Sequence, residues 1–225
     1  PAGPAGNLAT MRRAGDVICL DITVAGAART AGVSPRTAQR ALSDGRLGMA
    51  RTIGRQTTTD DLATLAWIRT TSPGRRWSTK TLDAAIDLLS GGDGQSLSSS
   101  ERSRLRSALR EMDARHIASS VWIGTWARYR TLGSVTVELI GPSAADMSAL
   151  GIVDGQSWVR FADVLDLDRF EGTQPVIADP DGDLVVLERP HDARSARIMV
   201  DTFVLGDARE SSAAAHQLEA RAHAL

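Results

Sequence analysis

The side chains best suited to chemistry in this chain lie within residues 34–43, SPRTAQRALS. If this segment is a helix, one of its faces carries the polar residues Arg36, Thr37, Gln39, Arg40 and Ser43. Guanidinium, amide and hydroxyl groups hydrogen-bond base edges and phosphate oxygens, and the N-terminal end of such a helix fits the major groove of DNA. The segment therefore predicts contact with double-stranded DNA.

Two short helices joined by a tight turn are expected to position this face. Alanines recur at helical spacing over residues 27–31, and Gly32 is able to adopt the positive φ of a turn. Ser34 is a good N-cap for the second helix, and Pro35 is tolerated at its first position. The alanine and leucine side chains within 38–42 form the buried face. The pattern is typical of a helix-turn-helix.

A two-stranded wing is expected to follow the second helix. Residues 47–53 and 56–58 have strand composition, and a tight turn at residues 54–55 joins them. A further helix, capped by Thr59 or Asp60, runs to about Ile68. The arginines of this region therefore lie on the strands and turn beside the polar helix.

Residues 24–68 resemble the winged helix-turn-helix of the excisionase and MerR-like families. Members commonly carry Gly-Arg at the wing turn and Asp-Leu at the start of the next helix, as Gly54-Arg55 and Asp61-Leu62 do here. An alanine-rich helical hairpin without DNA function is the alternative. The predicted DNA-binding residues are Ser34, Arg36, Thr37, Gln39, Arg40, Ser43, Arg46, Arg51, Arg55, Gln56, Arg75, Arg76 and Lys80.

Charge is unevenly distributed along the chain, although the formal total is only −1. Residues 1–130 carry 19 basic side chains against 11 acidic ones, whereas residues 131–225 carry 7 against 16. A basic segment is attracted to a polyanion and an acidic segment is repelled. We therefore expect the two parts to bind different partners, and a solvated surface with a chance split is the alternative.

Length and composition limit the architecture and the location. A chain of 225 residues with 42% hydrophobic content suffices for two globular domains. No run approaches the roughly 18 apolar residues of a membrane span, and residues 1–15 lack the apolar core of a signal peptide. A cytoplasmic, nucleoid-associated protein without a membrane partner is expected. Cys19 is the only cysteine, which excludes an internal disulfide.

The expected fold class is α+β, with an N-terminal winged helix-turn-helix and helical extension followed by a C-terminal mixed α/β domain. Its parts are a flexible tail over residues 1–20, the winged helix-turn-helix over 21–70, the helical extension over 71–130 and the acidic α/β domain over 131–225. In the extension, apolar spacing predicts a helix over 78–89 and a second one after the capping box of Ser98 and Glu101.

An arginine row marks the second of these helices. Arg102, Arg106 and Arg110 recur at four-residue spacing, opposite the apolar stripe. Such a row is able to contact a phosphate backbone, to pair with acidic residues or to stay solvated. The same three interpretations apply to Arg75, Arg76 and Lys80, and the sequence leaves them open.

The C-terminal part is expected to mix short strands and helices. Strands are predicted over 135–140 and 157–161, and helices over 144–150 and 162–170. Residues 176–188 are predicted to form a hairpin. The chain is expected to close with a helix over 207–221 that is exposed and forms the interface of a homodimer.

No set of residues indicates catalysis. The histidines His116, His191, His216 and His223 are scattered, and no metal-ligand or nucleophile motif is present. Three carboxylates within residues 179–183 lack the spacing of a calcium loop, so we expect them to form a turn. The aromatic residues Trp122, Trp126 and Tyr129 are expected to pack in a core rather than to stack on bases. We expect no enzymatic activity, no metal and no cofactor.

The whole chain resembles the actinobacterial helix-turn-helix proteins related to AbiEi-type antitoxins. The resemblance covers the excisionase-like winged helix, the SSSERSRLRSALR helix, the strand-turn-helix ELIGPSAADMSALGI, the DPDGDLVVL hairpin and the LGDARESSAA helix. It implies an autorepressor that binds its own promoter and counters a nucleotidyltransferase-like toxin through its C-terminal domain. The positions that it carries over are the DNA contacts Arg36, Thr37, Gln39, Arg40 and Arg55.

The expected function is therefore that of a sequence-specific DNA-binding (auto)repressor acting as the antitoxin of a toxin–antitoxin pair. One alternative is a pathway transcription regulator. The other is an excisionase-like architectural DNA-binding protein without a toxin partner. The long acidic C-terminal part argues against the architectural role, because excisionases are usually little more than the winged helix.

Overall fold

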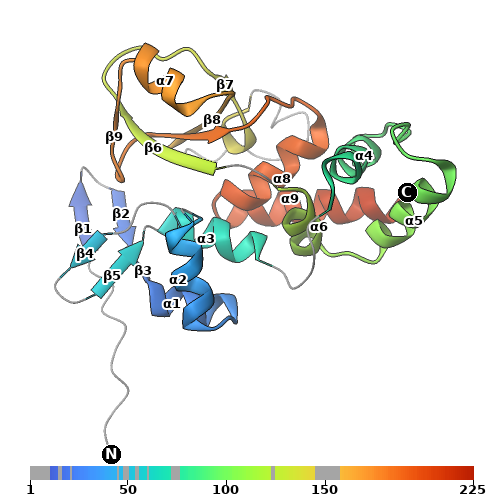
Figure 1. Cartoon of the computed structure of the whole chain (residues 1–225), viewed down its shortest axis with the longest axis horizontal. Coiled ribbons are helices and arrows are strands. Elements are labelled where there is room, and N and C mark those ends of the chain that lie inside the picture. Colours follow the sequence, from blue (N-terminus) through green and yellow to red (C-terminus); the bar gives the residue numbers. More distant parts are fainter. Residues whose placement is uncertain are drawn as a thin grey trace, which may run out of the picture. The chain divides into compact units, whose positions relative to one another are not determined.

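The structure is a computed structural model and describes residues 11–14, 17–20, 22–44, 46–47, 51–53, 56–59, 61–71, 77–122, 125–144 and 158–225. Helices and strands are both well represented, so the fold class is α+β, as expected. The chain divides into two compact units, Pro1–Ile68 and Arg69–Leu225 (Figure 1). The helical extension expected over residues 71–130 is therefore not a separate unit but part of the second one.

The first unit pairs two helices with a small antiparallel sheet. Its elements after residue 20 are β3 (Ile22–Thr23), α1 (Val24–Ala31), α2 (Pro35–Ser43), β4 (Arg51–Ile53), β5 (Gln56–Thr59) and the greater part of α3 (Asp61–Thr70). The strand order is β3-β5-β4. Within the expected tail, β1 (Met11–Ala14) pairs antiparallel with β2 (Val17–Leu20), so residues 11–20 differ from the flexible segment that was expected.

Alanines allow α1 and α2 to approach closely. Ala27 and Ala38 are fully buried, and both belong to a core that Leu47 and Trp67 complete. Small side chains bring helix axes together, and the indole of Trp67 fills the space that they leave. The core of this unit therefore depends on α3 as well as on the helix pair.

The second unit joins two helices at the C-terminus to three helices from the segment 79–121. These are α4 (Thr79–Leu89), α5 (Ser99–Arg110), α6 (Ala114–Val121), α8 (Ser195–Leu205) and α9 (Ala208–His223). Contacts join α4 and α6 to α8, and α5 and α6 to α9. The apolar stripes of the 79–121 helices are thus covered by the C-terminal helices, which explains why the extension is not a unit of its own.

The terminal helix α9 is packed within the chain, contrary to the expectation of an exposed helix. Ala214, Leu218 and Ala222 are fully buried along one face. The Arg221 guanidinium donates to the carbonyl of Leu89 and to the hydroxyl of Ser195. Its apolar face is therefore already covered and is not available as a dimer interface.

A five-stranded mixed sheet forms the rest of the second unit. Its strands are β6 (Thr125–Thr131), β7 (Glu138–Leu139), β8 (Arg160–Val164), β9 (Val176–Ala178) and β10 (Leu184–Glu188), in the order β7-β8-β10-β6-β9. The helix α7 (Leu167–Thr173) lies on one face (Figure 1). There Tyr129 and Phe170 stack edge to face with ring centroids 5.4 Å apart, and the Tyr129 hydroxyl donates to Glu171.

Several predicted boundaries in this unit were wrong. Residues 162–164 continue strand β8, and the helix begins only after the Asp166 cap. The strand expected over 135–140 is limited to Glu138–Leu139 and is followed by the 3-10 turn Gly141–Ser143. Most of the helix expected over 144–150 lies outside the described residues, as does the start of the strand expected at 157.

The predicted hairpin over 176–188 was also wrong, although both strands are present. β9 and β10 do not pair with each other, because each pairs antiparallel with β6, which lies between them. The connecting turn therefore passes across β6. A Cβ on Gly182 would lie 1.9 Å from the Tyr129 carbonyl oxygen, so glycine is needed at this crossing.

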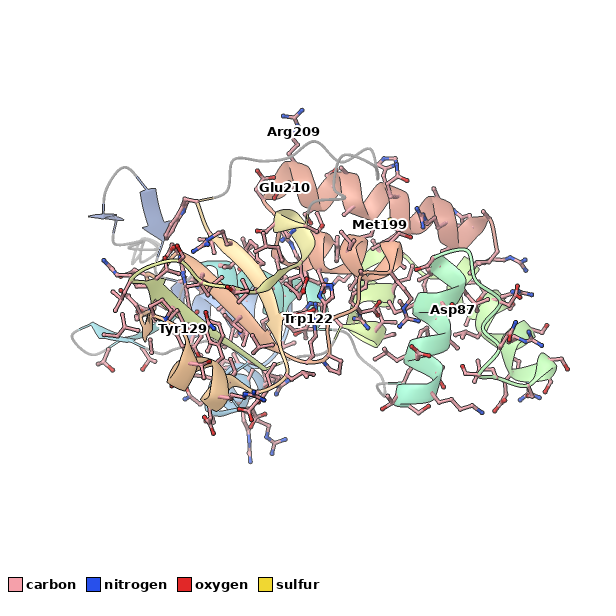
Figure 2. The ribbon with its side chains drawn as sticks, turned by 90° about the horizontal axis from the view of Figure 1, so that it is seen from above. Asp87, Trp122, Tyr129, Met199, Arg209 and Glu210 are labelled. Carbon is pink, nitrogen blue, oxygen red and sulfur yellow. The ribbon has the colours of Figure 1, made fainter. Side chains whose placement is uncertain are left out.

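Of the three aromatic residues expected in a core, Trp122 and Tyr129 are buried and Trp126 is half-buried. Figure 2 shows Tyr129 on strand β6. Burial and the neighbouring Glu171 carboxylate raise the pKa of the Tyr129 hydroxyl, which therefore stays protonated and keeps donating its hydrogen bond. These positions agree with a packing role for Trp122 and Tyr129.

A buried arginine fastens the sheet to helix α8. Arg189 Nε donates to Asp163 at 2.7 Å, and its two terminal nitrogens bind the Asp201 carboxylate at 3.0 and 2.5 Å. The side chains of Asp163 and Asp201 are fully buried, and that of Arg189 is 3% exposed. Burial raises the pKa of Asp163, although Arg189 acts in the opposite direction. Charges buried this deeply are stable only when they are paired.

Arg189→Met tests this pairing. Removing one partner of a buried ion pair costs about 3–5 kcal/mol, so we expect a loss of that size in the free energy of unfolding, measured by urea titration. Burial raises the pKa of Asp163, and without the guanidinium this carboxylate would take up a proton more readily in the folded variant than in the unfolded chain. The loss should therefore shrink as the pH falls.

Arg130→Met is the matched control for this experiment. Arg130 forms a 2.6 Å pair with Asp179, but its side chain is 57% exposed. An exposed pair contributes about 0–1 kcal/mol, so this variant should unfold almost as the parent does. Equal losses in the two variants would contradict the role given to Arg189.

Candidate nucleic-acid interface

The turn between α1 and α2 is fixed by the backbone. Gly32 has φ +69° and ψ +30°, and its N–H donates to the Arg29 carbonyl at 3.2 Å. The N–H of Val33 donates to the Ala28 carbonyl at 3.0 Å. These two bonds form a Schellman motif, which satisfies the free carbonyls at the end of α1 and reverses the chain.

Helix α2 begins as its sequence predicts. Ser34 is the N-cap, and its Oγ accepts the Thr37 N–H at 3.2 Å, while Pro35 occupies the first helical position. The hydroxyls of Ser34 and Thr37 lie 2.9 Å apart. Ser34 therefore has a structural role at the helix start, in addition to any contact with a ligand.

The structure brings the predicted polar residues of α2 together on one exposed face. Ala38 and Ala41 are buried beneath it. The exposed residues are Arg36, Thr37, Gln39, Arg40 and Ser43. The Ser43 hydroxyl donates to the Gln39 carbonyl within the helix at 3.1 Å.

Arg36 and Arg40 are the strongest candidates on this face for contact with a ligand. They are one helical turn apart, and neither has a side-chain hydrogen bond or ion pair within the part of the chain that the structure describes. Their guanidinium groups each keep a full set of donors. Such groups bind phosphate and the acceptor edge of guanine with two hydrogen bonds.

Both strands expected after α2 are present and paired, but the first is shorter than the expected 47–53: β4 covers Arg51–Ile53, and Leu47 lies in a turn. β4 and β5 are antiparallel, with Arg51 opposite Thr58 and Ile53 opposite Gln56. Among the described strands of this sheet, β4 forms one edge. The Gly54-Arg55 turn lies outside the described residues, and of Arg51 and Gln56 the structure describes the backbone alone.

The remaining predicted contacts are not grouped with α2. Arg46 pairs with Asp44 at 2.9 Å, and because both side chains are exposed the pair restrains the guanidinium only weakly. Lys80 is exposed in the first turn of α4, which belongs to the second unit. Arg75 and Arg76 lie outside the described residues.

The division into units changes the charge argument. Residues 1–68 carry eight arginines against five acidic residues, and residues 69–225 carry 18 basic against 22 acidic residues. Many of the basic side chains counted over residues 1–130 thus belong to the same unit as the acidic C-terminal segment. The first unit is basic, but less strongly than the count at residue 130 indicated.

The described residues contain no group of three histidine, cysteine or carboxylate side chains arranged to hold a metal ion. The turn carboxylates of Asp179 and Asp183 instead accept hydrogen bonds from Arg130, Thr131 and Arg160. Within the same part of the chain, no helix has the length and apolar character needed to cross a membrane.

Gly32→Ala tests the turn that orients α2. A Cβ at Gly32 would meet no atom within 4 Å, so the cost comes from the left-handed backbone alone. We expect a loss of about 1–2 kcal/mol in the free energy of unfolding, measured by urea titration. Gly172→Ala in α7 is the control, because Gly172 has equal space without a positive φ. That change should be neutral or stabilising, and destabilisation of similar size in both would contradict the prediction.

Comparisons with known proteins do not place the chain in a family. No protein-family model, curated protein or solved structure matches it. The geometry of the α2 face is therefore what supports a function.

Proposed function

We propose that the first unit binds double-stranded DNA with sequence specificity, with α2 in the major groove and the β4–β5 strands beside the phosphate backbone. One observation carries this proposal: Arg36 and Arg40 are exposed on α2, and neither has an intramolecular ion-pair partner in the described structure. The helix itself is held by a Schellman turn and an N-cap. A winged helix-turn-helix presents its second helix in this way.

The arrangement suits base reading because its scaffold is rigid. Ala38 and Ala41 fix the inner face of α2 in the core, so the outer side chains project from a defined position. Thr37 and Gln39 add a hydroxyl and an amide between the two guanidinium groups. This combination of groups is able to distinguish base pairs by their donors and acceptors in the major groove.

Arg36→Ala and Arg40→Ala separate base reading from phosphate contact. The full chain is first used to select its preferred duplex from a random pool. We expect at least one of the two variants to lose about 1–3 kcal/mol of binding free energy on the selected duplex, and much less on a random duplex. Fluorescence anisotropy at fixed salt concentration measures both.

The control for this experiment is Arg169→Ala, because Arg169 is exposed and belongs to the second unit. It removes the same charge without touching α2, and its affinity for the selected duplex should stay close to that of the parent. Equal losses on selected and random DNA for both α2 variants would show that the helix contacts only the backbone. Unchanged binding in both would refute the assignment of α2.

The cellular role that we propose is that of an autorepressing antitoxin, and it depends on the sequence resemblance to AbiEi-type proteins. If a nucleotidyltransferase-like gene lies beside this one, co-expression of the full chain should restore growth. The double variant Arg36→Ala, Arg40→Ala should still restore growth but lose promoter repression, because the acidic segment is intact. If the full chain fails to restore growth, the antitoxin role is refuted, and the remaining interpretation is a DNA-binding regulator of another pathway.

A further inference from the structure

A basic groove runs along helix α5 in the second unit. It is lined by Ser99, Arg102, Ser103, Arg106, Arg110 and Leu225, with a volume of about 410 Å³. The five polar side chains lie along one face of the helix, since their spacing is three or four residues. All five side chains carry hydrogen-bond donors, and none is acidic.

The charge in this groove has no carboxylate to balance it on its own helix. Within α5, no acidic residue lies three or four positions from Arg102, Arg106 or Arg110. Asp113, three positions after Arg110, lies beyond the helix, where it caps α6 and pairs with His116. Glu101 accepts hydrogen bonds from the backbone and hydroxyl of Ser98 in the capping box. Like charges four residues apart repel one another and destabilise a helix. A bound anion would offset this repulsion among the three arginines.

Arg106 supplies an independent observation. Its Nε is buried and has no hydrogen-bond partner within the described part of the chain. Arg102 is held at one end of the groove, where it donates to the Asp93 carbonyl at 3.2 Å. A buried donor without a partner is costly, and a bound anion is one of the few groups that satisfies it.

We propose that this groove binds the phosphate backbone of a nucleic acid, as a contact site separate from α2. The shape favours a polyanion over a single phosphate. Arg102 and Arg110 are eight residues apart, which is about 12 Å along a helix. Neighbouring charges on a DNA strand are about 3.4 Å apart along the axis, so the row is long enough to contact more than one phosphate.

The test uses the full chain with Arg102, Arg106 and Arg110 all changed to Gln. Binding to a random-sequence duplex is measured from 50 to 200 mM salt, in the parent and in an Arg36→Ala, Arg40→Ala background. Each lost phosphate contact lowers the salt slope by about 0.9. If two contacts are lost, the ratio of affinities at 50 and 200 mM salt should fall about tenfold in both backgrounds.

The control changes Arg104, Arg169 and Arg209 to Gln, which removes the same charge from exposed positions of the same unit. Figure 2 shows Arg209 pointing away from the body of α9. This triple variant should keep a slope close to that of the parent. Equal slopes in the groove and control variants would overturn the proposal, whether or not α2 binds DNA. Whether α2 binds DNA is tested separately, by the effect of Arg36→Ala and Arg40→Ala on affinity for the selected duplex.

Inorganic phosphate tests whether the groove binds a single free anion instead of a nucleic-acid backbone. For a backbone site, 10 mM phosphate should raise the melting temperature of the parent and of the groove variant by the same small amount, within about 1 °C. Stabilisation of the parent alone, with unchanged DNA slopes, would show a single-anion site and refute the nucleic-acid assignment. Melting temperatures in buffer also verify that both triple variants fold.

Discussion

The second unit depends on one buried guanidinium. Arg189 follows strand β10, and it reaches Asp163 on strand β8 and Asp201 on helix α8. All three side chains are excluded from water, so each carboxylate needs the guanidinium as its partner. The other oxygen of Asp163 lies 3.6 Å from His191 Nδ1 and has no hydrogen-bond partner among the described residues. The registers of β8 and β10 and the position of α8 are therefore linked through a single side chain.

That link explains how helices from distant parts of the sequence form one unit. α8 is held to the sheet by Asp201, and in turn it covers α4 and α6, while α9 covers α5. Arg197, also on α8, donates to the Val121 carbonyl at the end of α6. The helices over 79–121 need α8 and α9 to cover their apolar stripes. The arginine row of α5 thus belongs to a unit whose net charge is negative, and it stays basic because its own face holds no acidic residue.

The first unit is organised by the backbone instead of by charge. Its helix pair is fixed by the left-handed Gly32, the Ser34 cap and alanines small enough for close packing. None of these features requires an ion pair, which leaves the arginines of α2 without intramolecular partners in the described structure. A scaffold that is stabilised by backbone hydrogen bonds and by the packing of small side chains leaves its charged groups available to a ligand.

The features that residue type and spacing predict correctly are those that local chemistry controls. The caps at Ser34 and Ser98, the left-handed Gly32 and the polar face of α2 all follow from residue type and spacing within a few positions. Ser78, expected as the first residue of its helix, is instead the N-cap. Tertiary structure alone decided that β6 lies between β9 and β10, and that α9 is covered. It also decided that Ala162–Val164 continue a strand. Strand pairing and helix coverage depend on contacts between residues far apart in the chain, and a pattern read within a short window contains no information about those contacts.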